Sequence, residues 1–160
     1  MERFSARGPD GVRFLSLGKI DDLEKQAPKR SLVALLEVLQ GFGGWDVIGD
    51  LEAGPTTPFE RYHSFAETAL VVVGPAWRSG MTARRLMPMV DDVPALVVSN
   101  RFQGQPDHPA LPSCVRIPFD PEAAEVERQG LAPVDECPDS PAVSAVGQLA
   151  DVLGGQALAT

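Results

Sequence analysis

Two short valine-rich segments constrain the fold of this chain most strongly. Ala69–Val73 reads ALVVV and Ala95–Ser99 reads ALVVS, so each segment is apolar on both sides of an extended chain. Strands that helices cover on both faces of a sheet have this composition. A helical pattern at Ser79–Met89 separates the two segments. Alternation of strand and helix indicates an α/β layer fold with a mainly parallel sheet.

Other segments extend this alternation. Further apolar runs predict strands at Val12–Leu17, Val47–Leu51 and Cys114–Phe119. Further helices are predicted at Ser31–Leu39, Pro121–Gly130 and Ser140–Leu153. The expected architecture therefore has three layers, with a mainly parallel sheet of about five strands and helices on both faces.

The predicted helices carry recognisable boundary residues. Ser31, Asp120 and Ser140 stand at N-cap positions, where a side-chain oxygen can accept hydrogen bonds from the first backbone N–H groups of a helix. Proline follows Asp120 and Ser140 at the first helical position, where its missing N–H is harmless. Glycines at Gly41–Gly44 and Gly154–Gly155 are expected to end the helices that precede them.

The length of 160 residues predicts one domain. The polar residues 1–10 are expected to be a loose N-terminal segment, and residues 11–160 a single α/β domain. The start of the chain lacks the apolar stretch of a signal peptide. The longest apolar run, Thr68–Pro75, is too short to span a bilayer. We therefore expect no membrane span and a cytoplasmic location.

Charge and composition exclude two further classes of protein. The chain has 14 Lys and Arg against 22 Asp and Glu, a net charge of −8, which argues against nucleic acid as a partner. It has two cysteines and two histidines, Cys114, Cys137, His63 and His108. The spacing of the two cysteines matches no known metal motif, so we expect no metal site.

Ligands of open parallel sheets bind beyond the carboxyl ends of the strands. Asp50 stands at such an end and Gly54 follows it, which is the layout of a magnesium-binding carboxylate with a switch loop behind it. The alternative, which the local pattern favours, is an ordinary aspartate that caps the next turn. Asp50 is thus one candidate catalytic residue.

Polar residues also follow the later strands. Asn100, with Arg101 beside it, follows Ser99, and its amide offers a donor and an acceptor to the edge of a nucleobase. The alternative is an asparagine in a turn. Pro118, Phe119 and Asp120 could line the same base pocket, or Asp120 could simply cap the following helix.

The order of these motifs resembles one known family, the MinD/ParA group of deviant P-loop ATPases. Within it, the chain looks most like the ATPases that assist nickel insertion into carbon monoxide dehydrogenase. The resemblance covers residues 11–154 and rests on these segments: Trp45–Gly54, Ala69–Pro75, Thr82–Leu86, Leu96–Arg101, Ile117–Asp120, Gly130–Pro133 and Pro138–Ala142. It implies that Asp50 is a Walker B-like residue that holds magnesium through water. It also implies that Asn100, Arg101 and Pro118–Asp120 surround adenine.

Two departures from the family pattern are equally informative. The family's phosphate loop ends in Gly-Lys-Ser/Thr, whereas the single Gly-Lys of this chain, Gly18-Lys19, is followed by Ile20. The nickel-associated members carry a Cys-x-Cys pair near the position of Asp21–Arg30, and no cysteine is found there. Nickel binding and cysteine-mediated dimerisation are therefore not implied.

Two functions follow from this pattern. In the first, the chain is a non-hydrolysing module that binds a protein partner or a second copy of itself. Its partner surface would include Glu52, Gly54, Pro55 and Phe59, because Pro55 and Pro58 stiffen the switch-like loop. In the second, the chain is one part of a split ATPase, and ATP and Mg²⁺ bind only when another polypeptide supplies the phosphate loop.

Overall fold

The computed structural model describes residues 6–7, 11–14, 37–38, 41, 44–50, 66–90, 93–104 and 111–157. The chain divides into two compact units, Met1–Leu51 and Glu52–Thr160. Most of the described secondary structure belongs to the second unit. The candidate nucleotide residues from Asn100 to Asp120 belong to that unit as well.

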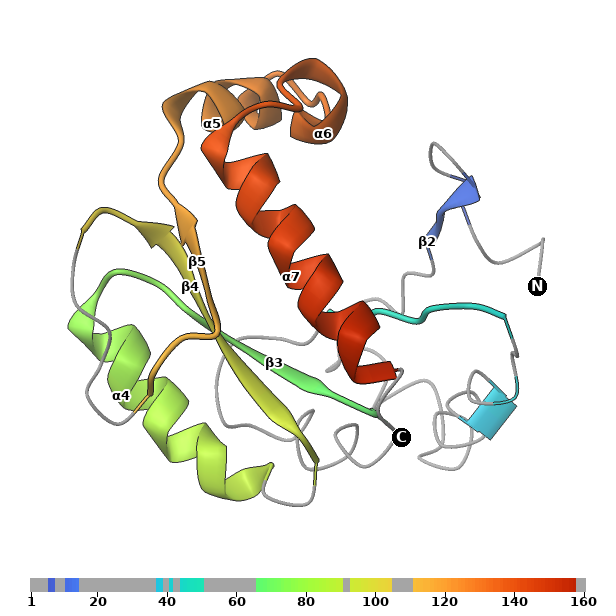
Figure 1. Cartoon of the computed structure of the whole chain (residues 1–160), viewed down its shortest axis with the longest axis vertical. Helices are drawn as coiled ribbons and strands as arrows, with labels where there is room; N and C mark the ends of the chain where they lie inside the picture. Colours follow the sequence, from blue (N-terminus) through green and yellow to red (C-terminus); the bar gives the residue numbers. More distant parts are fainter. Residues whose placement is uncertain are drawn as a thin grey trace, which may run out of the picture. The chain divides into compact units, whose positions relative to one another are not determined.

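The second unit is built on a three-stranded parallel sheet (Figure 1). Its strands are β3 (Ala69–Val73), β4 (Ala95–Phe102) and β5 (Val115–Pro118), in the order β3-β4-β5. Both strand pairs are parallel. The predicted α/β character and parallel pairing are therefore confirmed. The bounds of β3 match the prediction, and β4 runs three residues beyond the predicted end at Ser99.

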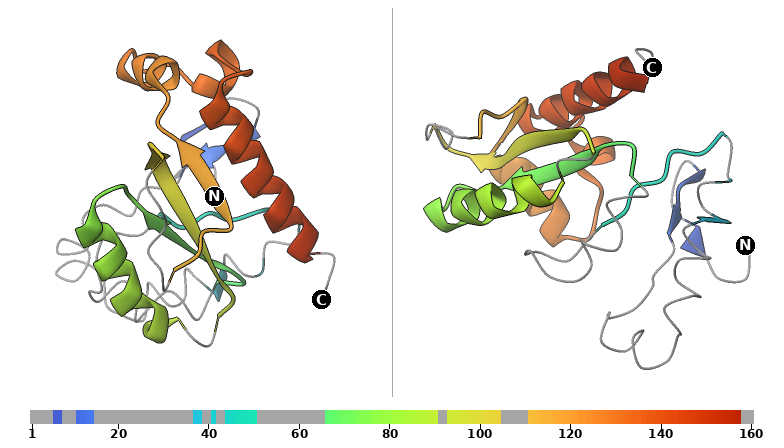
Figure 2. Two further views of the ribbon diagram at one scale, coloured as in Figure 1. Left: turned by 60° about the vertical axis from the view of Figure 1, so that its left-hand side comes forward. Right: turned by 90° about the horizontal axis from the view of Figure 1, so that it is seen from below.

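Helical segments follow β3 and β5, whereas no described helix lies between β4 and β5. They are α4 (Trp77–Leu86), the 3₁₀ segment η3 (Met87–Met89), α5 (Pro121–Arg128), α6 (Pro133–Glu136) and α7 (Pro141–Ala157). The helix α4 packs against β3, and α7 packs against β5. Figure 2 shows α4 and α7 on opposite sides of the sheet. None of the described helices is long and apolar enough to cross a membrane.

The core follows the alternation of side chains along the strands. On one face, Val71 and Val97 pack with Ala83 of α4 and with Leu111. On the other face, Val98 and Val115 lie opposite each other on paired strands and are both buried. Burial on both faces of β4 agrees with the valine-rich composition of its sequence.

One face of β3 differs from the expectation. Leu70 is 40% exposed and Val72 is 57% exposed, although Val72 lies directly beside Val98 on the neighbouring strand. The difference arises because α7 packs on β5 and β3 is the edge of the described sheet. The sequence of β3 predicted cover on both faces, and the second face of this strand is open.

The predicted strand Val12–Leu17 is present only in part. Arg13–Phe14 form β2, which pairs antiparallel with β1 (Ala6–Arg7) rather than joining the parallel sheet. The sequence before Arg13 explains the pairing, because Gly8-Pro9-Asp10-Gly11 has the composition of a turn and Gly11 adopts a φ of 83°. Residues 1–10 were expected to be loose, but Ala6–Arg7 within them pair with β2.

The predicted strand Val47–Leu51 is not formed in the described part of its range. Residues 44–50 carry no strand or helix, and Leu51 lies outside the described residues. Trp45, Val47 and Ile48 are all exposed. A strand needs a hydrogen-bonding neighbour, and the described residues of this unit supply none to this segment. The prediction of about five strands in one sheet is therefore shown for three.

The helix predictions are accurate at the starts that a capping residue marks. Asp120 and Ser140 cap α5 and α7 as predicted. The predicted end of α7 at Gly154–Gly155 is wrong, because the helix continues to Ala157. The helix predicted over Ser79–Met89 begins earlier, at Trp77. Its last turn is 3₁₀ around Pro88, whose missing N–H cannot donate to a helical carbonyl.

The first predicted helix, Ser31–Leu39, is described only at its end. Glu37 and Val38 are helical, and the N–H of Gly41 donates to both of their carbonyl oxygens. The N-cap residue Ser31 lies outside the described residues. The helix α6 was not predicted, because its four residues are too few to show a helical period.

The difference in burial between Val98 and Val72 predicts a difference in the cost of truncating each side chain. Val98→Ala removes two methyl groups from a side chain that is 1% exposed, so we expect the free energy of unfolding to fall by about 2 kcal/mol. Val72→Ala at the paired position serves as the control and should cost less than about 0.5 kcal/mol. Urea denaturation of both variants measures the difference. Equal losses would show that the open face of β3 is covered in solution.

Candidate functional site

The candidate site lies at the carboxyl ends of β4 and β5. Asn100 pairs with Ile117 in the ladder, and Phe102 pairs with Pro118. The N–H of Phe119 then donates to the carbonyl oxygen of Phe102 at 2.8 Å. These pairings bring the five predicted nucleotide-binding residues, Asn100, Arg101, Pro118, Phe119 and Asp120, to one end of two adjacent strands. Asn100 and Arg101 lie within β4 itself rather than in a turn after it.

A bulge in β4 sets the local geometry. The register shifts between Asn100 and Phe102, and Arg101 between them adopts a φ of 58°. This left-handed conformation is uncommon for residues other than glycine. The Oδ1 atom of Asn100 accepts a hydrogen bond from the Arg101 N–H at 2.9 Å. The acceptor proposed for a nucleobase edge therefore already serves the backbone of the bulge.

Two pairs of side chains surround this bulge. The guanidinium of Arg116 lies over the ring of Phe102, 5.3 Å from its centroid, a cation–π contact. The hydroxyl groups of Ser99 and Ser113 are 2.7 Å apart. Neither pair was predicted from the sequence. Arg116 stands between two apolar residues of a strand, a pattern that marks an outward-facing cation, but its partner is distant in the sequence.

The carboxylate of Asp120 accepts hydrogen bonds from the starts of two helices. Its Oδ1 accepts from the N–H groups of Glu122 at 3.0 Å and Ala123 at 3.2 Å, at the start of α5. Its Oδ2 accepts from the N–H of Ala142 at 3.3 Å, in the first turn of α7. The carboxylate therefore caps two helices. A contact between Asp120 and a nucleobase stays a prediction.

The environment of Asp120 lowers its pKa. Partial removal of water raises the pKa, but hydrogen bonds from Ala123, Ala142, Ser140 and Glu122 to the carboxylate outweigh this effect. Ser140 also caps α7 directly, because its Oγ accepts from the N–H of Val143 at 3.2 Å and the residue is buried. The charged form of Asp120 is thus the form that the starts of α5 and α7 stabilise.

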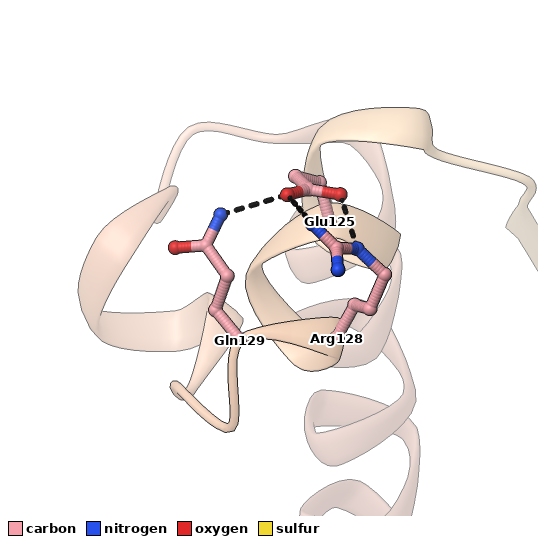
Figure 3. Close-up of polar contacts among 3 residues, drawn as sticks. All are labelled: Glu125, Arg128 and Gln129. Carbon is pink, nitrogen blue, oxygen red and sulfur yellow. Dashed lines mark hydrogen bonds and ion pairs between the residues drawn. The ribbon is translucent and has the colours of Figure 1, made fainter.

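A second polar cluster lies on the surface of α5 (Figure 3). Arg128 donates to both carboxylate oxygens of Glu125, at 2.8 Å and 2.6 Å, and Gln129 donates to one of them at 2.9 Å. The hydrogen bond from Arg128 is the main reason why the pKa of Glu125 is lowered. Exposed pairs at this helical spacing contribute little stability. We assign this cluster to the helix surface.

The other candidate residues belong to the first unit or lie outside the described residues. Asp50 belongs to the first unit, Met1–Leu51, and is exposed. Glu52, Gly54, Pro55 and Phe59, the predicted switch or partner surface, lie outside the described residues. Among the residues that are described, no three His, Cys, Asp or Glu side chains are grouped as metal ligands would be.

Comparisons with known proteins assign no family to the chain. No protein-family model matches its sequence. No curated protein matches it either. The resemblance to MinD/ParA ATPases therefore rests on the motifs of the sequence alone and stays a prediction.

The double cap predicts how stability depends on pH. Asp120→Asn keeps the shape but places an amide nitrogen against backbone donors, so we expect the thermal midpoint at pH 7 to fall by about 5 °C. Because the pKa of Asp120 is lowered in the folded state, its contribution is present above about pH 4 and is lost as the pH falls through the folded value. The gap between wild type and variant should therefore shrink in acid.

Asp151→Asn provides the matched control, because Asp151 is an exposed aspartate in the middle of α7. Calorimetry from pH 2.5 to pH 7 measures all three proteins. A gap between wild type and Asp120→Asn that does not change with pH would contradict a role for the carboxylate charge.

Proposed function

We propose that this chain is a partner-binding module on a nucleotide-binding type of α/β fold, and that it does not hydrolyse nucleotides by itself. The observation that carries this proposal is the edge of β3, which no strand among the described residues covers. The strand is the edge of the described sheet, and its sequence, ALVVV, has neither a charge nor a proline. Exposed edges without such protection readily pair with another strand.

The hydrogen-bonding pattern identifies the groups on this edge. The N–H of Ala69 donates to the carbonyl of Pro94 at 2.8 Å, toward β4. Since successive residues of a strand direct their N–H and C=O groups to opposite sides, Leu70 and Val72 direct theirs away from β4. Their side chains are the two exposed apolar groups of the same strand. An extended segment of a partner could bond to both residues and cover both side chains.

The polar groups of the candidate site support the absence of hydrolysis. Phosphoryl transfer depends on positioning and on charge around the phosphates. The 160 residues contain no Gly-Lys-Ser/Thr sequence. Asp120 accepts hydrogen bonds from the first turns of two helices, and the Oδ1 atom of Asn100 accepts one from the backbone of the bulge. The two acceptors predicted to contact a nucleotide therefore already accept hydrogen bonds from the backbone.

The open edge also favours a second candidate function. A strand added beside β3 could come from a polypeptide that carries a phosphate loop. In that split ATPase, Asp50 would hold Mg²⁺ through water, and Asn100, Arg101 and the Pro118–Asp120 segment would contact the adenine of ATP. This alternative needs the second polypeptide for any activity.

The isolated chain should not release phosphate from ATP or GTP above the background rate. The expectation follows from the missing Gly-Lys-Ser/Thr sequence. A steady-state phosphate-release assay with Mg²⁺ measures it, and Asp50→Ala is the control for contaminating activity. Turnover that Asp50→Ala abolishes would overturn the non-hydrolysing proposal.

The edge of β3 should be required for association. Val72→Lys places a charge where an added strand would pack, so we expect self-association, or capture of the native partner, to weaken at least about tenfold. Val134→Lys is the matched control, because Val134 is a similarly exposed valine, 62% against 57%, on α6. Light scattering over a range of concentrations and affinity capture from the native host measure the two variants. A wild-type chain that stays monomeric and captures no partner would contradict the proposal.

A further inference from the structure

The backbone of Arg101 is the least expected local feature of the second unit. Every other described residue with a positive φ is a glycine: Gly11, Gly44, Gly104 and Gly130. Only at Arg101 does the described chain place a long side chain in this conformation. Glycine would adopt it without steric conflict. Strained residues of this kind are concentrated at functional sites, so the outlier supports a role for the arginine side chain.

The side chains of Asn100 and Arg101 offer mainly hydrogen-bond donors to a ligand. The Oδ1 atom of Asn100 accepts the Arg101 N–H, and the Asn100 amide nitrogen carries two further N–H donors. The Arg101 guanidinium carries five donors and no acceptor. Among the described residues, the structure gives this guanidinium no hydrogen bond and no ion pair. Arg101 is exposed, so a ligand can reach it.

The position of the bulge in the sheet points in the same direction. The bulge lies at the carboxyl end of parallel strands, where ligands of open α/β sheets bind. Asp120 is the first carboxylate after β5 in the sequence. It already accepts hydrogen bonds from the N–H groups of two helices.

We propose that the carboxyl end of β4 binds a small oxyanion, a phosphoryl or carboxylate group, through the Arg101 guanidinium and the Asn100 amide. The planar guanidinium matches both groups because it can donate two parallel hydrogen bonds to their oxygens. This site requires neither a phosphate loop nor a protein partner, and it is separate from the edge of β3.

Titrations of the full chain followed by two-dimensional ¹H–¹⁵N spectra test this site. The probes are inorganic phosphate, sodium acetate and sodium chloride at constant ionic strength. We expect phosphate to shift the amides of Arg101 and Phe102 in the millimolar range. Arg101→Gly should weaken this binding at least tenfold while it relieves the backbone, and Arg85→Ala, which removes an exposed arginine of α4, should leave it unchanged.

Each outcome decides the proposal. Shifts with phosphate alone assign a phosphoryl site, and shifts with acetate as well assign a general oxyanion site. Equal shifts with chloride, no shifts at all, or an Arg101→Gly variant that binds like wild type would overturn it. Arg101→Asn, a residue that tolerates the left-handed conformation, replaces the glycine variant if that variant does not fold. None of these results depends on a protein partner, so partner binding is tested separately.

Discussion

A single carboxylate organises the carboxyl end of the sheet. Asp120 follows β5 directly and accepts hydrogen bonds from the first turns of both α5 and α7. Unpaired N–H groups and the positive end of the helix dipole make each helix start a favourable site for a negative charge. Because the same side chain serves two helices, it fixes the start of α7 relative to the end of β5. The helix α7 packs on β5, the strand that Asp120 follows.

The sequence predicted those parts of the structure that local chemistry determines. The bounds of β3 follow from its composition, and the caps at Asp120 and Ser140 follow from their residue types and the prolines after them. Contacts between distant segments were not predictable. The bond from Ala142 to Asp120 joins residues 22 positions apart. The continuation of α7 through Gly154–Gly155 depends on whether the chain turns back, which glycine permits but does not enforce.

The candidate site shows the same division. Sequence reasoning placed Asn100, Arg101, Phe119 and Asp120 at strand ends, and the structure brings them to one end of β4 and β5. It could not predict the bulge, because nothing in the residue type of Arg101 indicates a positive φ. Nor could it predict that one face of β3 is open, since that depends on which strand α7 covers.

These differences change the chemistry that the site offers. A nucleobase edge is read by a donor and an acceptor together, and in this structure the acceptors Asn100 Oδ1 and Asp120 hold the backbone of the bulge and the two helices. The side-chain N–H donors of Arg101 and Asn100 bond to no acceptor among the described residues. The carboxyl end of the sheet therefore favours oxyanions over base edges, while the apolar edge of β3 favours another strand. The proposed oxyanion site and the proposed partner surface thus use different parts of one small sheet.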